Sequence, residues 1–487
     1  MGTTLSTAGF HITAIHHLKK HKAMKSHCLI LLLIVGCAEE KTSPALGVDD
    51  VTFDTTLLSH PNTTLGFLLS VESSEPIQTE TIVSTENTSV TFNTDTYQPE
   101  QLIEVLDIKP ETTYNIETSV LAEDGREGNT DSMSFTTGPQ PATIPEFTVT
   151  ISDSTAHHQS TILFGMIMEG IYGIGVDPAG DLIWYYPLYI ADERTLTRQV
   201  KPIGEDRYLL TIKGGLQVIT KSGDVEIALR REDLDFRLHH DVIMLPNGNF
   251  MGLANEQMVI DVEELGGPTT VKGDKIVEFD TLGNVIWEWS AFDHLNTQRY
   301  PSLLSRQLSS QDQTVDWSHA NGVQYNPADD TIVVSLRHQN WIIKIDYSTG
   351  ELLWVLGDEG DFDLLSGAWF HAQHAPILTE DDHILIYDNG NERPQEQGGE
   401  YSRAVIYKLD EQNKTAQQVW EYQTENYTER FGNAIYLKNG NIMVCAGGMG
   451  NTNRSVAQLI EVTTDNPAKE VWRLEAQNQE IYRVYER

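Results

Sequence analysis

Hydrophobic and polar residues alternate through most of this chain, and the segments beyond residue 45 lack the spacing of an amphipathic helix. Alternation with a period of two predicts half-buried β-strands. The strands are separated by turns rich in Gly, Asn and Asp, which are typical of antiparallel hairpins. The pattern therefore predicts an all-β protein.

One turn type recurs from about residue 147 onward, with a Gly followed four residues later by a large apolar residue. Examples are Gly180…Trp184, Gly223…Ile227, Gly283…Trp287 and Gly350…Trp354. Trp420 and Trp472 stand in similar strands without the Gly, which makes six units.

A second recurring unit is a polar turn between two apolar strands. It occurs at 245–250, 326–333, 378–385 and 437–442, with a weaker copy at 204–209. Hairpins that repeat at this length predict a six-bladed β-propeller over residues 147–487. An array of β-sandwiches is the competing architecture, but it would not require the two turn types to alternate.

Residues 46–138 also alternate and are rich in Thr, Val and Ser. Their last strands, with Tyr114 and a closing Thr136-Thr137, resemble the end of a fibronectin type III sandwich. Pro139-Gln-Pro141 is a stiff linker. We find no catalytic cluster in this region and expect it to have a spacer or packing role.

The N-terminal 37 residues have the features of a targeting segment. Met24-Lys25 precedes a short apolar run, 29–35, which ends in Ile34-Val35-Gly36-Cys37. This pattern resembles a bacterial lipoprotein signal, with Met24 as the true start, Cys37 as the lipidated residue and 38–45 as a tether. We therefore expect export to the cell envelope and a lipid anchor, facing the periplasm or in the outer membrane. A plain secretory signal is the alternative.

The composition narrows the possible partners. The chain has 33 basic and 71 acidic residues, a net charge of −38, so it should repel nucleic acid. Cys445 is the one cysteine after residue 37, which rules out an intramolecular disulfide framework there. We expect Cys445 to be a buried, inert thiol.

Polar residues flank the second type of hairpin at equivalent positions. Each of them stands at the start of the strand before a turn or at the end of the strand after it. Because antiparallel pairing puts these two positions side by side, they should meet at one end of the propeller channel. The residues are His240, Asn255, His319, Asn321, Arg337, His374, Asn389 and Asn433. A structural polar ring is the competing interpretation.

This set of side chains limits the chemistry. Three histidines could bind zinc, but the chain has no His-Glu-x-x-His pattern, and Arg337 would repel a cation. Calcium is disfavoured because the groups are rich in nitrogen. Arg, His and Asn donors suit a tetrahedral oxyanion such as sulfate or phosphate, and a neutral imidazole can act as a nucleophile. We expect neither a metal nor a cofactor.

Several motifs resemble the bacterial aryl-sulfate sulfotransferase family over residues 150–480. They are Asp316-Trp-Ser-His-Ala-Asn321, Arg337-His-Gln339, the segment 342–357, His239-His240-Asp241, Gln373-His374 and Asp388-Asn-Gly390. The resemblance implies a six-bladed propeller that moves a sulfuryl group from an aryl sulfate to a phenol without a nucleotide donor.

The resemblance also implies residue roles. His374 would be the nucleophile of a ping-pong reaction through a sulfohistidine, and His240, His319, Asn321 and Arg337 would bind the sulfuryl oxygens and the phenolate. We expect Asn255, Asn389 and Asn433 to contact the substrate. His371 is the second candidate for the nucleophile, and His239 is the second candidate for the role of His240.

Three other functions compete with sulfuryl transfer. A non-catalytic binding module at the cell surface has the same fold, because fold does not imply function. A quinone-dependent dehydrogenase needs metal-binding carboxylates, and none is suitably placed. A sulfatase-like hydrolase would use water in place of the phenol.

Overall fold

The computed structural model describes residues 41–42, 51–130, 132–166, 172–188, 199–212, 214–262, 267–300, 314–448 and 456–487. The predicted signal segment with Cys37 and almost all of the 38–45 tether lie outside these residues, so lipidation and export stay predictions. Among the described residues, no helix is long and apolar enough to cross a membrane.

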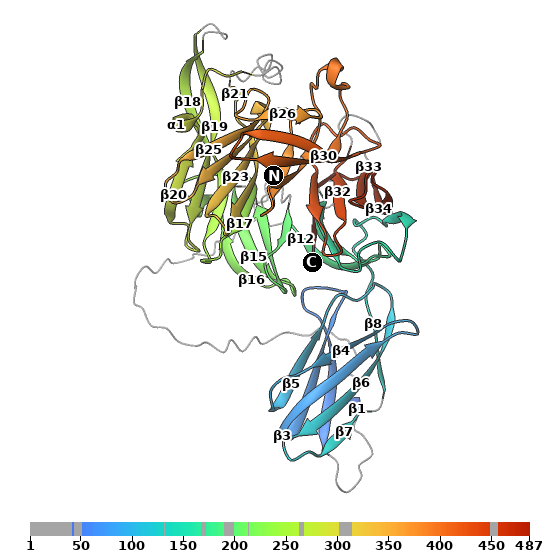
Figure 1. Ribbon diagram of the computed structural model, residues 1–487. Helices are drawn as coiled ribbons and strands as arrows, with labels where there is room; N and C mark the ends of the chain where they lie inside the picture. Colours follow the sequence, from blue (N-terminus) through green and yellow to red (C-terminus); the bar gives the residue numbers. More distant parts are fainter. Residues whose placement is uncertain are drawn as a thin grey trace, which may run out of the picture. The chain divides into compact units, whose positions relative to one another are not determined.

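The N-terminal strands form one hydrogen-bonded sheet around their own hydrophobic cluster (blue to cyan in Figure 1). The long strand β3 pairs with β2 and β5 along its first half and with β4 and β6 along its second. The strands are β1 (Lys41–Thr42), β2 (Phe53–Ser59), β3 (Phe67–Ser84), β4 (Ser89–Asn93), β5 (Gln98–Val105), β6 (Thr113–Ala122), β7 (Glu127–Asn129) and β8 (Met133–Thr136). The fibronectin type III resemblance remains a prediction.

The rest of the described chain forms six sheets, antiparallel apart from the pairs β19–β21 and β26–β30, so the prediction of a six-bladed β-propeller is confirmed (green to red in Figure 1). Blade 1 contains β10 (Ile162–Met166), β11 (Tyr172–Val176), β12 (Leu182–Pro187) and β35 (Ile481–Glu486). Blade 2 contains β13 (Val200–Pro202), β14 (Arg207–Ile212), β15 (Gly215–Thr220) and β16 (Val225–Leu229). Blade 3 contains β17 (Leu238–Met244), β18 (Phe250–Val262), β19 (Gly267–Phe279), β20 (Val285–Ser290) and the short β21 (Thr314–Asp316).

Blades 4 to 6 follow the same plan. Blade 4 contains β22 (Ala320–Asn326), β23 (Thr331–Leu336), β24 (Trp341–Asp346) and β25 (Leu352–Gly357). Blade 5 contains β26 (Asp363–Ser366), β27 (His374–Leu378), β28 (His383–Asp388), β29 (Arg403–Asp410) and β30 (Thr415–Gln423). Blade 6 contains β31 (Asn433–Tyr436), β32 (Ile442–Ala446), β33 (Val456–Val462), β34 (Glu470–Gln477) and β9 (Thr148–Ser152). The described helices are the short α1 (Ala291–His294), η1 (Arg231–Asp233), η4 (Arg337–Gln339) and η5 (Gln395–Gln397).

Two strands from opposite ends of the propeller segment close the ring. The C-terminal β35 pairs with β10 and becomes the inner strand of blade 1. The N-terminal β9 pairs with β34 at the outer edge of blade 6. Each of six hydrophobic clusters joins one blade to the next. The core is thus a set of blade-to-blade interfaces rather than one central mass.

The repeated tryptophans link neighbouring blades. The indole nitrogens of Trp184, Trp289, Trp420 and Trp472 each donate a hydrogen bond, at 2.8–3.1 Å, to a backbone oxygen of the following blade. In blade 3 the linking residue is Trp289, whereas Trp287 of the predicted repeat packs against Tyr347. The alternating pattern therefore marks both the outer strands and the joints between blades.

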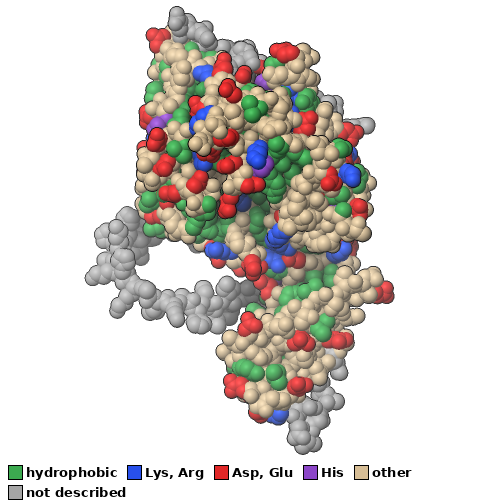
Figure 2. All heavy atoms as spheres, in the orientation of Figure 1, with side chains coloured by type: hydrophobic (Ala, Val, Ile, Leu, Met, Phe, Trp, Pro, Cys, Tyr) green, Lys and Arg blue, Asp and Glu red, His purple; other side chains and the backbone are tan. Residues whose placement is uncertain are grey.

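Acidic side chains are spread over the face seen in Figure 2, with Lys and Arg between them. Among the described residues, the face shown in Figure 2 has no basic stripe of the kind that follows a nucleic-acid backbone.

Candidate active site

The inner strands of blades 3 to 6 all begin at the same end of the propeller. In blades 4 to 6 the first strand pairs its starting residue with the end of the second strand, as in His374 with Tyr387 and Asn433 with Cys445. In blade 3 the start of β17 pairs with the middle of the longer β18, Leu238 with Ala254. Strands β17, β22, β27, β31 and β35 also contact one another in this order. The structure therefore places the eight predicted site residues at one end of the blades.

Three of these strands, β17, β22 and β27, have a β-bulge near their first residue, next to a histidine of the predicted site. The register shifts just after His239, Ala320 and His374, and the backbone is left-handed at His240 (φ 52°), His319 (φ 48°) and Ala375 (φ 46°). A bulge bends its strand and redirects a side chain, and each left-handed residue other than Gly costs about 1–2 kcal/mol. These conformations lower the stability of the fold and orient the side chains of the site, which is common at functional sites.

The environment of His374 sets which ring nitrogen carries its proton. Asn389 Oδ1 lies 2.6 Å from Nδ1 of the buried His374. The Asn389 amide nitrogen donates to the carbonyls of Thr428 (2.8 Å) and Phe431 (2.9 Å), so its oxygen has to face the imidazole. That oxygen can only accept a hydrogen bond, and His374 therefore holds its proton on Nδ1 and a lone pair on Nε2.

His374 is also kept neutral. Burial lowers its pKa well below the usual value, and the positive charge of Arg337 lowers it further. A neutral imidazole with its lone pair on a defined nitrogen is the form that attacks an electrophile.

Arg337 and His319 approach the same end of the channel from blade 4. Arg337 is partly exposed, and one guanidinium nitrogen donates to the carbonyl of Glu429 at 2.9 Å. Burial lowers its pKa to about 10, which leaves it charged at neutral pH. His319 Nδ1 lies 2.6 Å from Asp316 Oδ2. Burial raises the pKa of Asp316, but the charge and hydrogen bond of His319 more than offset this and hold it well below its usual range.

His240 lies against two aromatic rings. Its ring centroid is 4.7 Å from that of His319 and 6.3 Å from that of Tyr482. Its Nδ1 lies 2.8 Å from Nδ1 of His239. His239, the alternative candidate, is thus in direct contact with the His240 ring.

The predicted asparagines differ in what their side chains contact. Asn321 is fully buried and donates to the Gln373 carbonyl at 2.8 Å. Asn433 donates to and accepts from the backbone of Val484, which joins β31 to β35. Asn255 is partly exposed on β18. The side-chain hydrogen bonds of Asn389 and Asn433 thus go to the protein itself, and substrate contact by the three predicted residues Asn255, Asn389 and Asn433 stays a prediction.

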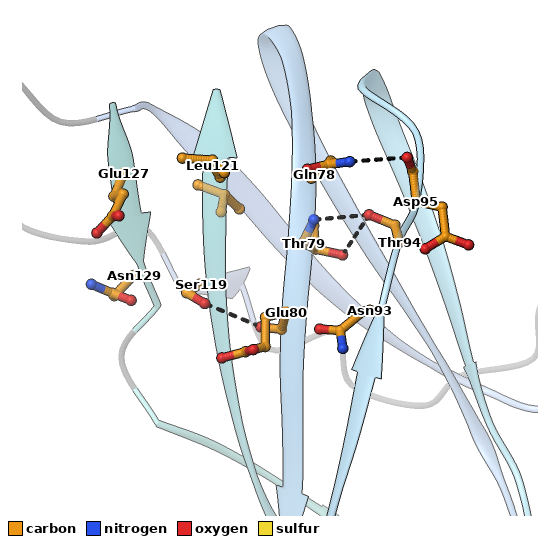
Figure 3. A pocket seen from close by; sticks show the side chains of 11 residues that line it. Gln78, Thr79, Glu80, Asn93, Thr94, Asp95, Ser119, Leu121, Glu127 and Asn129 are labelled. Atoms are coloured by element: carbon orange, nitrogen blue, oxygen red, sulfur yellow. Dashed lines mark hydrogen bonds between the residues drawn. The ribbon is translucent and has the colours of Figure 1, made fainter. Parts of the chain in front are cut away.

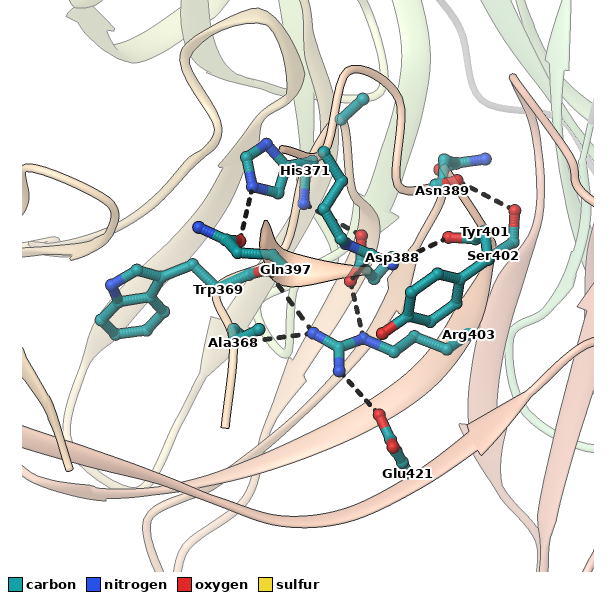
Figure 4. A network of polar contacts seen from close by, with 12 residues as sticks. Ala368, Trp369, His371, Asp388, Asn389, Gln397, Tyr401, Ser402, Arg403 and Glu421 are labelled. Atoms are coloured by element: carbon teal, nitrogen blue, oxygen red, sulfur yellow. Dashed lines mark hydrogen bonds and ion pairs between the residues drawn. The ribbon is translucent and has the colours of Figure 1, made fainter. Parts of the chain in front are cut away.

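A buried polar network holds the backbone beside Asn389 (Figure 4). The Asp388 carboxylate binds Arg393 at 2.5 Å and Arg403 Nε at 2.8 Å, and it accepts the backbone N–H of His371 at 2.9 Å. The His371 ring lies 3.3 Å from Gln397 Oε1, on the side of the network away from Asn389 in Figure 4. His371, the alternative nucleophile, is therefore part of the support for blade 5.

Sequence reasoning missed the contribution of β35. The centroid of the Tyr482 ring lies 6.3 Å from that of His240 and 6.4 Å from that of His374. Arg483 binds Asp241 at 2.8 Å and the backbone oxygen of Asn321. The strand follows no polar hairpin turn of the repeated type, so the rule that found the other residues gave no signal for it.

Next to His240 in the chain, Asp241 is the centre of an ion cluster between the inner strands. Asp241 binds Lys201 at 2.8 Å and Arg483 at 2.8 Å, and accepts the backbone N–H of Val323 at 3.1 Å. Burial raises the pKa of Asp241, but the two cations bring it down to about 2. The cluster ties together the inner strands of blades 1, 2, 3 and 4.

Two other features could bind a ligand. Asp316, His319 and His338 offer three potential metal ligands within 4.8 Å of one another, so the prediction of a metal-free site stays untested. The N-terminal sheet carries an open hollow of about 630 Å³ between β3, β4, β6 and β7, with Glu80, Asp95 and Glu127 as its charged lining (Figure 3). Its lining holds neither His nor Arg, so it lacks the groups for oxyanion chemistry.

Taken together, the channel end offers a neutral nucleophilic imidazole, a guanidinium and two further imidazoles. Cationic and hydrogen-bonding donors around a neutral nucleophile suit transfer of an anionic tetrahedral group.

Comparison with known proteins agrees with this chemistry. The chain matches the profile of the family described as Arylsulfotransferase (ASST) over residues 150–483. A protein named arylsulfate sulfotransferase AssT from Escherichia coli O6:H1 is 25% identical over 252 residues, 38% of this chain and 40% of that protein. A protein of the same name from Lelliottia amnigena is 30% identical over 141 residues, 23% of each chain. The aligned parts thus span less than half of either relative.

Among solved structures, a protein of unknown function from Bacteroides caccae has a TM-score of 0.42 at 14% identity, over 67% of this chain and 98% of that chain. A putative 6-phosphogluconolactonase from Bacteroides fragilis has a TM-score of 0.34 at 14% identity, over 85% of this chain and 98% of that chain.

Proposed function

The chain belongs to the arylsulfotransferase family, and we propose that it moves a sulfuryl group from an aryl sulfate ester to a phenol through a sulfohistidine at His374. The observation that carries the proposal is the Asn389–His374 hydrogen bond at 2.6 Å. It leaves the lone pair on Nε2 of a neutral ring, so the nucleophile needs no base to remove a proton first.

In the first half-reaction, Nε2 of His374 attacks sulfur in line with the ester oxygen. The nitrogen–sulfur bond forms as the sulfur–oxygen bond breaks, and the aryl oxide leaves with the bonding electrons. The positive charge of Arg337 and the donors on His319 and His240 stabilise the charge on the transferring group and on the leaving oxygen.

In the second half-reaction, a phenol loses its proton and attacks the same sulfur, which restores the lone pair on His374. The overall exchange is one aryl sulfate and one phenol for the other aryl sulfate and the other phenol, which is ping-pong chemistry. Asn389 is a positioning residue in this scheme, because it orients the nucleophile and does not touch the reacting atoms.

The test uses the full-length protein with p-nitrophenyl sulfate. Wild type should release nitrophenolate in a burst with donor alone and continuously once a phenol is added. After donor alone, mass spectrometry should find one sulfuryl group on His374. H374A should lose both the burst and the modification, whereas H371A should keep them.

Each other outcome has a clear meaning. Unchanged release by H374A, or loss in H371A with release kept in H374A, would refute the assignment of the nucleophile. No release with any aryl sulfate would favour a binding module. Continuous release with donor alone, beyond the burst, would indicate a hydrolase.

A further inference from the structure

The short helix η4 carries Arg337, and its own hydrogen bonds are too few to fix it. Asn340 ends the helix in a left-handed conformation (φ 53°) and donates its backbone N–H to the Arg337 carbonyl at 3.3 Å. A single 3₁₀ turn has poor hydrogen-bond geometry and little stability of its own. The backbone N–H of Arg337 binds the His319 carbonyl at 3.2 Å, which holds the start of the turn. The orientation of the guanidinium therefore also depends on what holds the other end, at Gln339.

Trp317, Arg299 and Gln339 are joined in a closed ring of hydrogen bonds. The fully buried Gln339 amide donates to the Trp317 carbonyl at 2.7 Å, and the Trp317 indole donates to the Arg299 carbonyl at 2.8 Å. One guanidinium nitrogen of Arg299 closes the ring, because it donates to the Gln339 carbonyl at 2.7 Å and to Gln339 Oε1 at 3.0 Å. Trp317 lies two residues before His319, and Gln339 lies two residues after Arg337. The ring thus supports the segments that carry both groups of the proposed site.

The Arg299 side chain is itself held on several sides. It is 13% exposed, and its guanidinium carbon lies 4.0 Å from the centre of the Trp341 ring. Its second terminal nitrogen donates to the Asp358 carbonyl at 3.3 Å and lies 3.3 Å from the Glu359 carboxylate. Burial lowers the pKa of Arg299, but a guanidinium keeps its proton in proteins. Arg299 is therefore a fixed cation that joins the segment after α1 to blade 4 at two points.

These contacts require an arginine. A guanidinium is planar, so it can stack on an indole while its N–H groups bind several oxygens in one plane. An ammonium is a point charge on a flexible stem and cannot make both kinds of contact at once. Arg299 reaches Arg337 through the backbone of η4, and the strength of that link depends on the shape of the guanidinium as well as on its charge.

We propose that Arg299 is a positioning residue for the reaction, which holds Gln339 and thereby keeps the Arg337 guanidinium at the transferring sulfuryl group. This inference rests on the proposed sulfuryl transfer. In the first half-reaction, Arg337 stabilises the charge on the sulfuryl oxygens as the nitrogen–sulfur bond forms. A displacement of about 1 Å at such a group can cost on the order of 10²-fold in rate, even when the mutation lies far from the chemistry. Arg299 prevents that displacement without touching the reacting atoms.

The experiment is a double-mutant cycle on the nitrophenolate burst from saturating p-nitrophenyl sulfate, with full-length R299L, R337L and the double variant. R337L should slow the burst on the order of 10²- to 10³-fold, the usual loss when one donor to a developing anionic oxygen is removed. R299L should slow it on the order of 10- to 100-fold. In the R337L background, R299L should change the burst by less than about threefold, because the group that it positions is already gone. If R337L releases too little nitrophenolate to time, R337K takes its place in the cycle.

Lys344→Met is the matched control. Lys344 is a buried cation of blade 4 that binds Asp329 at 2.9 Å and Glu411 at 2.8 Å, and Asp329 stands in the turn at the end of the blade away from the site. K344M should keep the burst within about threefold with and without Arg337. R299K keeps the positive charge and should still slow the burst, because an ammonium cannot replace the stacked, forked contacts. It is also the second variant for the cycle if circular dichroism shows that R299L is not folded.

The outcomes separate this inference from the proposed function. If wild type gives no burst, sulfuryl transfer itself is refuted and the role of Arg299 falls with it. If wild type gives the burst and folded R299L or R299K keeps it within about threefold, Arg299 has no positioning role. Equal losses from the Arg299 substitution with and without Arg337, in folded proteins, would show a general structural effect and would refute the inference as well.

Discussion

Replacing Asn389 with Leu tests how much of the reactivity of His374 comes from its orientation. The variant removes the acceptor 2.6 Å from Nδ1 and leaves that buried N–H without its partner. Removing the acceptor and leaving a buried donor unsatisfied costs about 1–3 kcal/mol. The reactive tautomer should therefore become less favourable by about 1–3 kcal/mol. At about 1.4 kcal/mol per tenfold change, the first turnover should slow by roughly 5- to 150-fold.

The assay for this variant is stopped-flow release of nitrophenolate from saturating p-nitrophenyl sulfate. The loss should fall on the rate of the first turnover rather than on the apparent affinity for the donor, because Asn389 does not touch it in our scheme. Asn441→Leu is the control. The Asn441 side chain also makes a partly buried hydrogen bond, to Glu461 at 2.7 Å, but it lies in blade 6 at the end away from the site. A folded N389L enzyme with a first-turnover rate within about threefold of wild type would refute the tautomer argument.

Two further predictions follow from the charges in the channel. Because the pKa of His374 is far below its ordinary value of 6.5, the nitrophenolate burst should stay nearly constant from pH 7.5 to about 5.5; a fall that follows a titration near 6.5 would show that the nucleophile is not held neutral. Asp241 has a pKa of about 2 when folded and about 3.9 when unfolded, so its stabilisation is present above pH 4 and is lost as the pH falls toward 2. Asp241→Asn should lower the free energy of unfolding at pH 7 by about 3–5 kcal/mol in urea titrations, because it leaves the buried Arg483 and the partly buried Lys201 without their counter-charge. In that variant the drop in stability between pH 4 and pH 2 should shrink, and an unchanged acid profile would contradict the assignment.

Local patterns predicted the parts of the fold that depend on neighbouring residues. Turn chemistry located five inner hairpins, and the spaced tryptophans marked the outer strands of most blades. The closure by β35 could not be predicted in this way, because Phe164 pairs with Val484 and no short-range pattern connects two residues so far apart. The sixth inner strand, and with it Tyr482 and Arg483, was therefore missing from the predicted site.

The site itself was predictable as a set of positions but not as a set of contacts. Strand ends identified His240, His319 and His374, because alternation and turn position fix where those residues lie. The position of the proton on His374 depends on Asn389, and that role follows from distances in the folded chain. His239 shows the difference. From the sequence, His239 was an alternative to the neighbouring His240, whereas in the structure its ring contacts that of His240.

The last strand of the chain, β35, completes both blade 1 and the end of the channel that carries the proposed site. A chain that stops before Ile481 lacks β35, so it has no inner strand in blade 1 and neither the Tyr482 ring nor the Arg483 contact to Asp241. The five other blades could begin to assemble, yet the channel end would stay open on one side. We therefore expect a protein truncated before β35 to lack sulfuryl-transfer activity, because its channel end is incomplete.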